Sequence, residues 1–283
     1  MREKVNGFVG VMAVAILCMV SGLCMVWGIA PVVLAVYVAA CAVCGRYMIT
    51  CIGCAAGVAA GSMGIAGLLH AYEYMIPGPA YSGVMVTEKY LVLLGLAMCL
   101  MKIVYSRNSR SYVRVIVVMS AAVLMGNIVV YADNMLMAAA YGVVEAAIFM
   151  CASVILKPGI GLLYTYICGD ASDVERDESW NISQGIVSLM ALAAVVLWVV
   201  PGEDIYGVNP AFMLALVLIL YAVYRTGAVY GCGMAAVAGS IVSVKLNDSR
   251  WLMWMLLVTL VMLIGRALTG RRKVSASLFY VLG

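Results

Sequence analysis

The sequence predicts an all-α protein, a polytopic transmembrane helix bundle of about ten spans with both termini cytoplasmic. Three observations predict this fold class. Hydrophobic residues make up 66% of the 283 residues and charged residues only 11%, whereas soluble domains are about half apolar and about a quarter charged. Long apolar runs recur along the whole chain, and lysine and arginine gather in alternate segments between those runs. A soluble core of this length could not bury so much apolar surface, so we expect lipid to be the solvent.

Each predicted helix is an apolar run close to the 20 or so residues that a hydrocarbon core of about 30 Å requires. The first run follows Met1-Arg-Glu-Lys and lacks a small-residue cleavage site after it, which favours an uncleaved helix over a signal peptide. Pro31, Pro77, Pro79, Pro158, Pro201 and Pro210 are all expected at span ends or in loops, where a missing backbone donor does no harm. The predicted spans, of which the eighth is the shortest, are 7–26, 29–45, 48–69, 88–105, 112–132, 135–156, 184–200, 209–224, 226–244 and 251–268.

The distribution of basic residues predicts the orientation. With the N-terminus inside, fourteen of the 17 Lys and Arg residues fall in inner segments, and only Lys89, Lys245 and Arg250 fall in outer ones. This positive-inside bias supports an even number of spans with both ends cytoplasmic. We therefore expect a helical membrane domain over 1–273 and a short cytoplasmic or interfacial tail over 274–283, which we interpret as the start of a truncated or absent downstream region. The acidic segment 157–183 is interpreted as a solvated connection, with divalent-metal binding by its clustered carboxylates as the alternative, and the segment 70–87 as an interfacial connection.

Two predicted helices carry small residues at spacings of three and four, which place them on one helix face. Such faces let a second backbone approach closely, so we expect helix packing there, with a sliding surface or glycine-lined pathway as the alternative. The residues are Gly53, Gly57, Gly61, Gly64 and Gly67 in the third span, and Gly227, Gly231, Ala235 and Gly239 in the ninth.

Glu145 lies at the midpoint of the sixth predicted span. A carboxylate at that depth is costly when charged and is a functional hypothesis by default. One interpretation is structural bonding to a neighbouring helix, for which Asn127 of the fifth span is a candidate partner. The other is a proton or ion relay.

The sequence contains no recognisable catalytic domain. It has no P-loop, no G-x-S-x-G, no Asp-Gly dipeptide and a single histidine, His70, which excludes HExxH. Cys41, Cys44, Cys51 and Cys54 bracket the turn at Arg46 and form a weak candidate for a four-thiolate zinc site. Their apolar neighbours favour cysteine as a small hydrophobe instead, so we expect neither a metal nor another cofactor.

Several stretches resemble one family. They are Val144-Glu145-Ala146-Ala147 leading to Leu156-Lys157-Pro158, then Ser183-Gln184-Gly185-Ile186-Val187-Ser188-Leu189, the glycine-rich run Gly227 to Gly239, and a helix ending Gly265-Arg266. Together with the ten-span layout, they are similar to the membrane region of stage II sporulation protein E. Where that family usually has paired glutamates opening the seventh span, this chain has Ser183-Gln184.

The resemblance implies a multi-pass protein of the bacterial inner membrane, located at the sporulation septum. In that family a cytoplasmic PP2C-type serine phosphatase follows the membrane region and activates the forespore sigma factor, and the division protein FtsZ is a partner. The resemblance thus implies a non-enzymatic anchoring and assembly module that self-associates. Because the basic residues are scattered among loops, we expect no nucleic-acid partner. The competing hypotheses are a small transporter or channel that uses Glu145, and an intramembrane enzyme that uses the cysteine pairs.

Overall fold

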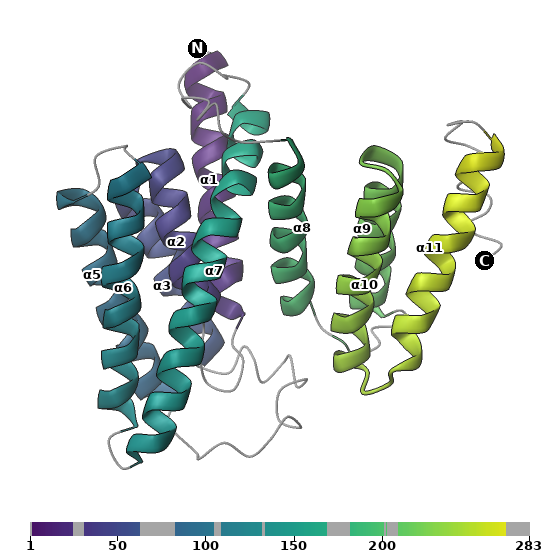
Figure 1. Cartoon of the computed structure of the whole chain (residues 1–283). Coiled ribbons are helices and arrows are strands. Elements are labelled where there is room, and N and C mark those ends of the chain that lie inside the picture. Colours follow the sequence, from purple (N-terminus) through teal and green to yellow (C-terminus); the bar gives the residue numbers. More distant parts are fainter. Residues whose placement is uncertain are drawn as a thin grey trace. The chain divides into compact units, whose positions relative to one another are not determined.

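The computed structural model describes residues 2–24, 31–62, 83–104, 109–131, 134–168, 182–200, 202 and 209–269. Within these ranges every regular element is an α-helix, which confirms the all-α prediction (Figure 1). The helices are α1 (Arg2–Leu23), α2 (Pro31–Cys44), α3 (Tyr47–Ser62), α5 (Gly83–Ile103), α6 (Ser109–Val130), α7 (Met135–Cys168), α8 (Ile182–Val199), α9 (Pro210–Arg225), α10 (Ala228–Lys245) and α11 (Arg250–Thr269). Each of them overlaps one predicted span.

Three of these helices are long and apolar enough to cross a membrane, fewer than the ten predicted spans. They are Ser111–Val130 in α6, Met135–Ile167 in α7 and Ala228–Lys245 in α10. Five further apolar helices of the described part, among them Val32–Cys44 and Pro210–Arg225, are 10–17 residues long. The structure therefore supports a membrane protein, and the ten-span topology stays a prediction.

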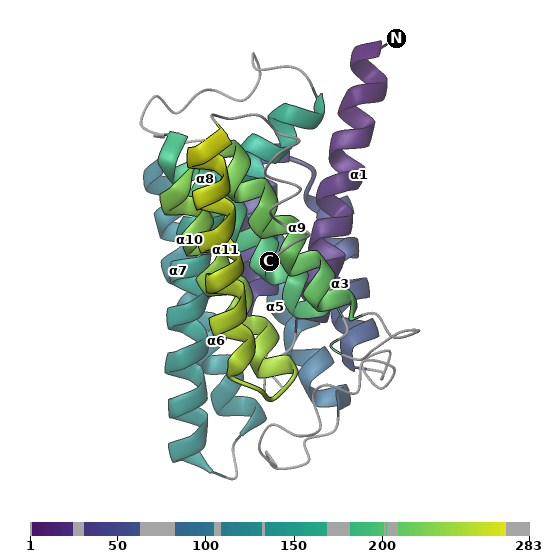
Figure 2. The same cartoon turned by 90° about the vertical axis from the view of Figure 1, so that its right-hand side faces the viewer.

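The chain divides into two compact units, Met1–Ala191 and Leu192–Gly283. In the first unit, α1 packs along α3 (Figure 2), and α7 packs against both α2 and α6 (Figure 1). The second unit packs α10 between α9 and α11. The predicted boundary at residue 273 lies outside the described residues.

Helix α2 is the centre of the first unit. It is apolar on every side, and a helix of that kind is normally buried on every side. Accordingly the eight consecutive residues from Val33 to Ala40 are at most 1% exposed. Because protein surrounds α2, its short length does not expose backbone polar groups to lipid.

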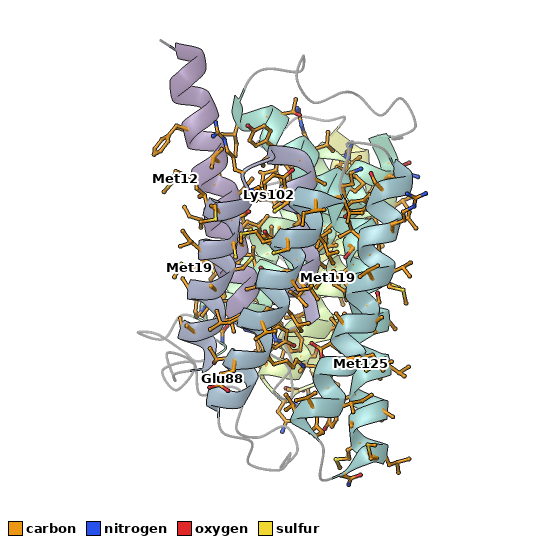
Figure 3. All side chains as sticks on the ribbon, turned by 90° about the vertical axis from the view of Figure 1, so that its left-hand side faces the viewer. Met12, Met19, Glu88, Lys102, Met119 and Met125 are labelled. Atoms are coloured by element: carbon orange, nitrogen blue, oxygen red, sulfur yellow. The ribbon has the colours of Figure 1, made fainter. Side chains whose placement is uncertain are left out.

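The outer surface of the first unit is apolar. Met12 and Met19 of α1 and Met125 of α6 are exposed, whereas Met119 of α6 is buried (Figure 3). Exposed apolar side chains on this scale are unusual on a soluble monomer and are typical of a surface that faces lipid or a partner.

Candidate functional site

The candidate site is a cluster of polar side chains between α5, α6 and α7. Glu145 of α7, Asn127 of α6 and Tyr90 of α5 are fully buried, and Lys89 of α5 is nearly so. Because α6 packs against both α5 and α7, it brings the three helices together around one point. We call these four side chains the polar cluster.

Both carboxylate oxygens of Glu145 accept hydrogen bonds from protein side chains. Lys89 Nζ donates to Oε2 at 2.7 Å, and Asn127 Nδ2 donates to the same oxygen at 2.6 Å. Tyr90 Oη donates to the other oxygen, Oε1. Three side-chain donors from two other helices therefore converge on this one carboxylate.

The Lys89 ammonium is similarly surrounded. Besides its bond to Glu145, it donates to Asn127 Oδ1 at 3.1 Å and lies 4.7 Å from the centre of the Tyr90 ring. Asn127 Nδ2 also donates to the backbone oxygen of Val123 at 3.0 Å, which fixes the amide orientation. The opposite charges of Lys89 and Glu145 compensate each other, so the buried cluster has no net charge.

The pairing of Asn127 with Glu145 is the contact that the sequence suggested. Lys89, in contrast, was expected only as a cation at the outer end of a span beginning at residue 88, and its burial was not predicted. Helix α5 begins at Gly83, so Lys89 lies inside the helix and its side chain is only 4% exposed. The sequence does contain a signal for this pair. One apolar run contains this cation and another contains a single carboxylate, and each charge is costly in lipid without an opposite charge beside it.

Pro158 also departs from the prediction. It was expected at the exit of the sixth span, but α7 continues through it to Cys168. A proline inside a helix removes one backbone hydrogen bond and distorts the turn before it. Here the N–H of the following residue, Gly159, donates to the Ser188 hydroxyl of α8 at 2.6 Å, so a side chain from another helix accepts from the backbone next to the proline.

In α3, the predicted packing glycines Gly53 and Gly57 face the backbone of α1. A Cβ on Gly53 would lie 2.7 Å from the carbonyl oxygen of Ala15, and one on Gly57 would meet the carbonyl oxygen of Met19. Gly61 is buried. Gly64 and Gly67 lie outside the described residues.

In α10, a Cβ on Gly231 would lie 2.6 Å from Val223 of α9, and one on Gly239 would lie 3.0 Å from Leu252 of α11. Ala235 is fully buried between them along the helix. Gly227 differs from the prediction, because it precedes α10 and has nothing within 4 Å of an added Cβ. Its φ of +107° is the reason for glycine there, since side chains rarely tolerate that backbone conformation.

The four cysteines near the α2–α3 turn do not assemble a metal centre in this structure. Cys41 Sγ lies 3.3 Å from the Thr50 hydroxyl, and Cys54 Sγ lies 3.9 Å from the backbone oxygen of Val33. Among the residues that the structure describes, no three His, Cys, Asp or Glu side chains lie close enough to hold a metal ion. His70 and the acidic residues of 170–178 lie outside the described ranges.

Comparisons of the chain with protein-family models, with curated proteins and with solved structures gave no match. The candidate function therefore rests on the chemistry of the polar cluster, the helix surfaces and the sequence resemblance.

Proposed function

We propose that this chain is a membrane-anchoring and assembly module that resembles the membrane region of stage II sporulation protein E. In this proposal it crosses the bacterial inner membrane about ten times with both ends cytoplasmic. It holds a cytoplasmic PP2C-type phosphatase at the sporulation septum, where that enzyme activates the forespore sigma factor. The chain itself performs no catalysis.

The polar cluster is the observation that carries the structural part of this proposal. A module that holds other parts in place needs helices that do not separate, and the cluster joins three helices through bonds between side chains. Both carboxylate oxygens of Glu145 accept hydrogen bonds from side chains of α5 and α6. These bonds hold the three helices together, which is a structural role. The close backbone contacts of Gly53 and Gly57 serve the same purpose between α1 and α3.

Support for the membrane location comes from the three long apolar helices and from the apolar outer surface of the first unit. The septal location and the phosphatase are supported by the sequence resemblance alone. The two parts of the proposal therefore need separate experiments.

Membrane integration is tested by fusing a fluorescent protein to the C-terminus and washing the membranes of the expressing bacteria with alkaline carbonate. We expect the fusion to stay in the pellet and to fluoresce, since the reporter folds only in the cytoplasm. Release into the supernatant contradicts membrane integration, and a dark but membrane-bound fusion contradicts the orientation.

Septal location is tested by expressing the same fusion in an endospore-forming bacterium during asymmetric division. We expect fluorescence to concentrate at the polar septum and FtsZ to co-purify with the chain. An even distribution around the cell membrane at every stage contradicts the sporulation part of the proposal and leaves the membrane part intact.

A transporter or channel is the second candidate, and one observation favours it. Lys89 and Glu145 form an ion pair inside the helices, and a proton can pass from Nζ to Oε2 along their 2.7 Å hydrogen bond to give a neutral amine and a carboxylic acid. Proteoliposomes that contain the chain and a pH-sensitive dye test this function. Proton flux above that of empty liposomes, lost in Glu145→Gln, would replace the anchoring proposal.

A further inference from the structure

One end of the first unit carries most of its described cations. Lys102 lies in the last turn of α5, Arg114 near the start of α6, Lys157 on α7 and Arg46 in the turn between α2 and α3. Figure 1 shows α5 and α7 ending, and α1 and α6 beginning, at this same end. Arg46, Lys102 and Arg114 are exposed and Lys157 is half-buried. We call these four residues the basic end.

The opposite end has a different charge. Glu88, near the start of α5, is exposed, and Figure 3 shows it far from Lys102 along the same helix. The neighbouring Lys89 is buried and bonded to Glu145, so it adds no cation to that surface. Among the described side chains of this unit, the exposed positive charge is therefore confined to the basic end.

Helix length places the cations of the basic end at a common depth. About 20 helical residues cross the hydrocarbon core. Counted from Met135, that length ends near Lys157, and counted from Gly83 it ends near Lys102. Counted backwards from Val130, it ends near Arg114. Three helices thus bring a cation to the level at which lipid headgroups begin.

Lys157 is held in place at this level. Its ammonium lies 4.7 Å from the centre of the Tyr112 ring, and the Tyr112 hydroxyl donates to the backbone oxygen of Ser153 at 2.7 Å. A cation on an aromatic face is attracted by the electrons of the ring. The half-buried ammonium is therefore positioned before any ligand arrives.

Apolar side chains adjoin the cations. Ile103 follows Lys102 and is 81% exposed, and Val113 precedes Arg114 and is 56% exposed. A small soluble anion would make no favourable contact with these apolar side chains. A phospholipid can place its phosphate against the cations and its acyl chains against the apolar side chains.

We propose that the basic end binds the headgroups of anionic phospholipids in the surrounding leaflet. This inference rests on the membrane location proposed above, and it adds a lipid preference that anchoring alone does not require. Lys102, Arg114 and Lys157 supply the charge, with Lys157 fixed by Tyr112. The module should therefore accumulate in regions of the membrane that are rich in anionic lipid.

The test is native mass spectrometry of the purified chain with added phosphatidylglycerol or phosphatidylcholine. We expect tighter binding of phosphatidylglycerol, and we expect Lys102→Gln and Arg114→Gln each to weaken it by roughly 5-fold, because one cation near an anionic surface contributes about that factor. Arg250→Gln in the second unit is the matched control, since its side chain is 81% exposed, and it should leave this binding unchanged.

Three outcomes overturn the lipid site: equal binding of the two lipids, equal weakening by Arg114→Gln and Arg250→Gln, or displacement of the lipid by water-soluble glycerol phosphate at the same concentration. The carbonate wash of the fusion protein separates this failure from that of the membrane proposal. A chain that stays in the membrane pellet but binds both lipids equally refutes only the lipid site.

Discussion

Lys89 Nζ lies 2.7 Å from Glu145 Oε2, although the two residues are 56 positions apart and both are buried. The bond joins α5 to α7, two helices that α6 separates in the chain. Because each charge is sheltered from solvent, each depends on the other for compensation. This dependence can be measured.

Removing one partner of the ion pair should be worse than removing both. We expect Lys89→Met and Glu145→Gln each to lower the free energy of unfolding by about 3–5 kcal/mol. Each substitution leaves the other member of the pair as a buried charge without its counter-ion. The double variant should lose much less than the sum of the two. Denaturant titration in mild detergent of the four proteins measures this, and additive losses would mean that the two residues are not coupled.

The two neutral members of the polar cluster should matter less than the ions. Tyr90→Phe removes the hydroxyl that donates to Oε1 and keeps the ring beside Lys89, and Asn127→Leu removes the bonds to both charges. Hydrogen bonds between membrane helices average about 0.6 kcal/mol and reach about 1.7 kcal/mol. We expect Tyr90→Phe near the lower value and Asn127→Leu at or above the upper one in the same unfolding assay. A greater loss for Tyr90→Phe than for Asn127→Leu would contradict this pattern of hydrogen bonds.

The contact between α1 and α3 should be sensitive to a single methyl group. A Cβ on Gly57 would meet the carbonyl oxygen of Met19 and would lie 3.0 Å from Gly22 Cα. We expect Gly57→Ala to destabilise the protein by about 1–3 kcal/mol through overpacking. The thermal unfolding midpoint in detergent is the measurement.

Gly95 of α5 is the control for Gly57, because nothing lies within 4 Å of a Cβ added there. Alanine is the better helix former by up to about 1 kcal/mol, so Gly95→Ala should be neutral or stabilising. If both variants unfold at the same temperature, the close approach of α1 and α3 is not a source of stability.

The proline turn in α7 should depend on a hydroxyl from α8. Ser188→Ala removes the acceptor of the Gly159 N–H, and we expect a loss of about 1 kcal/mol. Gly159→Ala should cost more, because its Cβ would lie 2.9 Å from the Ser188 Cβ. Hydrogen exchange of the Gly159 amide checks the mechanism, since faster exchange in Ser188→Ala is expected, and unchanged exchange would exclude this bond as the source of protection.

The sequence by itself determined the helical fold and the approximate position of every described helix. Apolar runs with polar, glycine or proline residues between them are local features, and a run such as 209–224 coincides with α9 because Asn209 caps it and Pro210 begins it. The same reasoning suggested that Glu145 needs a partner and that Asn127 is one.

Only the tertiary structure decided which residues complete the site and which turns stay helical. Lys89 faces Glu145 because α5 begins at Gly83 and packs against α6, and nothing in the residues near Lys89 specifies that contact. Pro158 stays inside α7, where Ser188, thirty positions away, bonds the adjacent backbone N–H. In the first case the buried charge of Lys89 is compensated by a residue from another helix. In the second case the amide that follows the proline donates to a hydroxyl from another helix. Such compensation depends on packing, which local patterns do not encode.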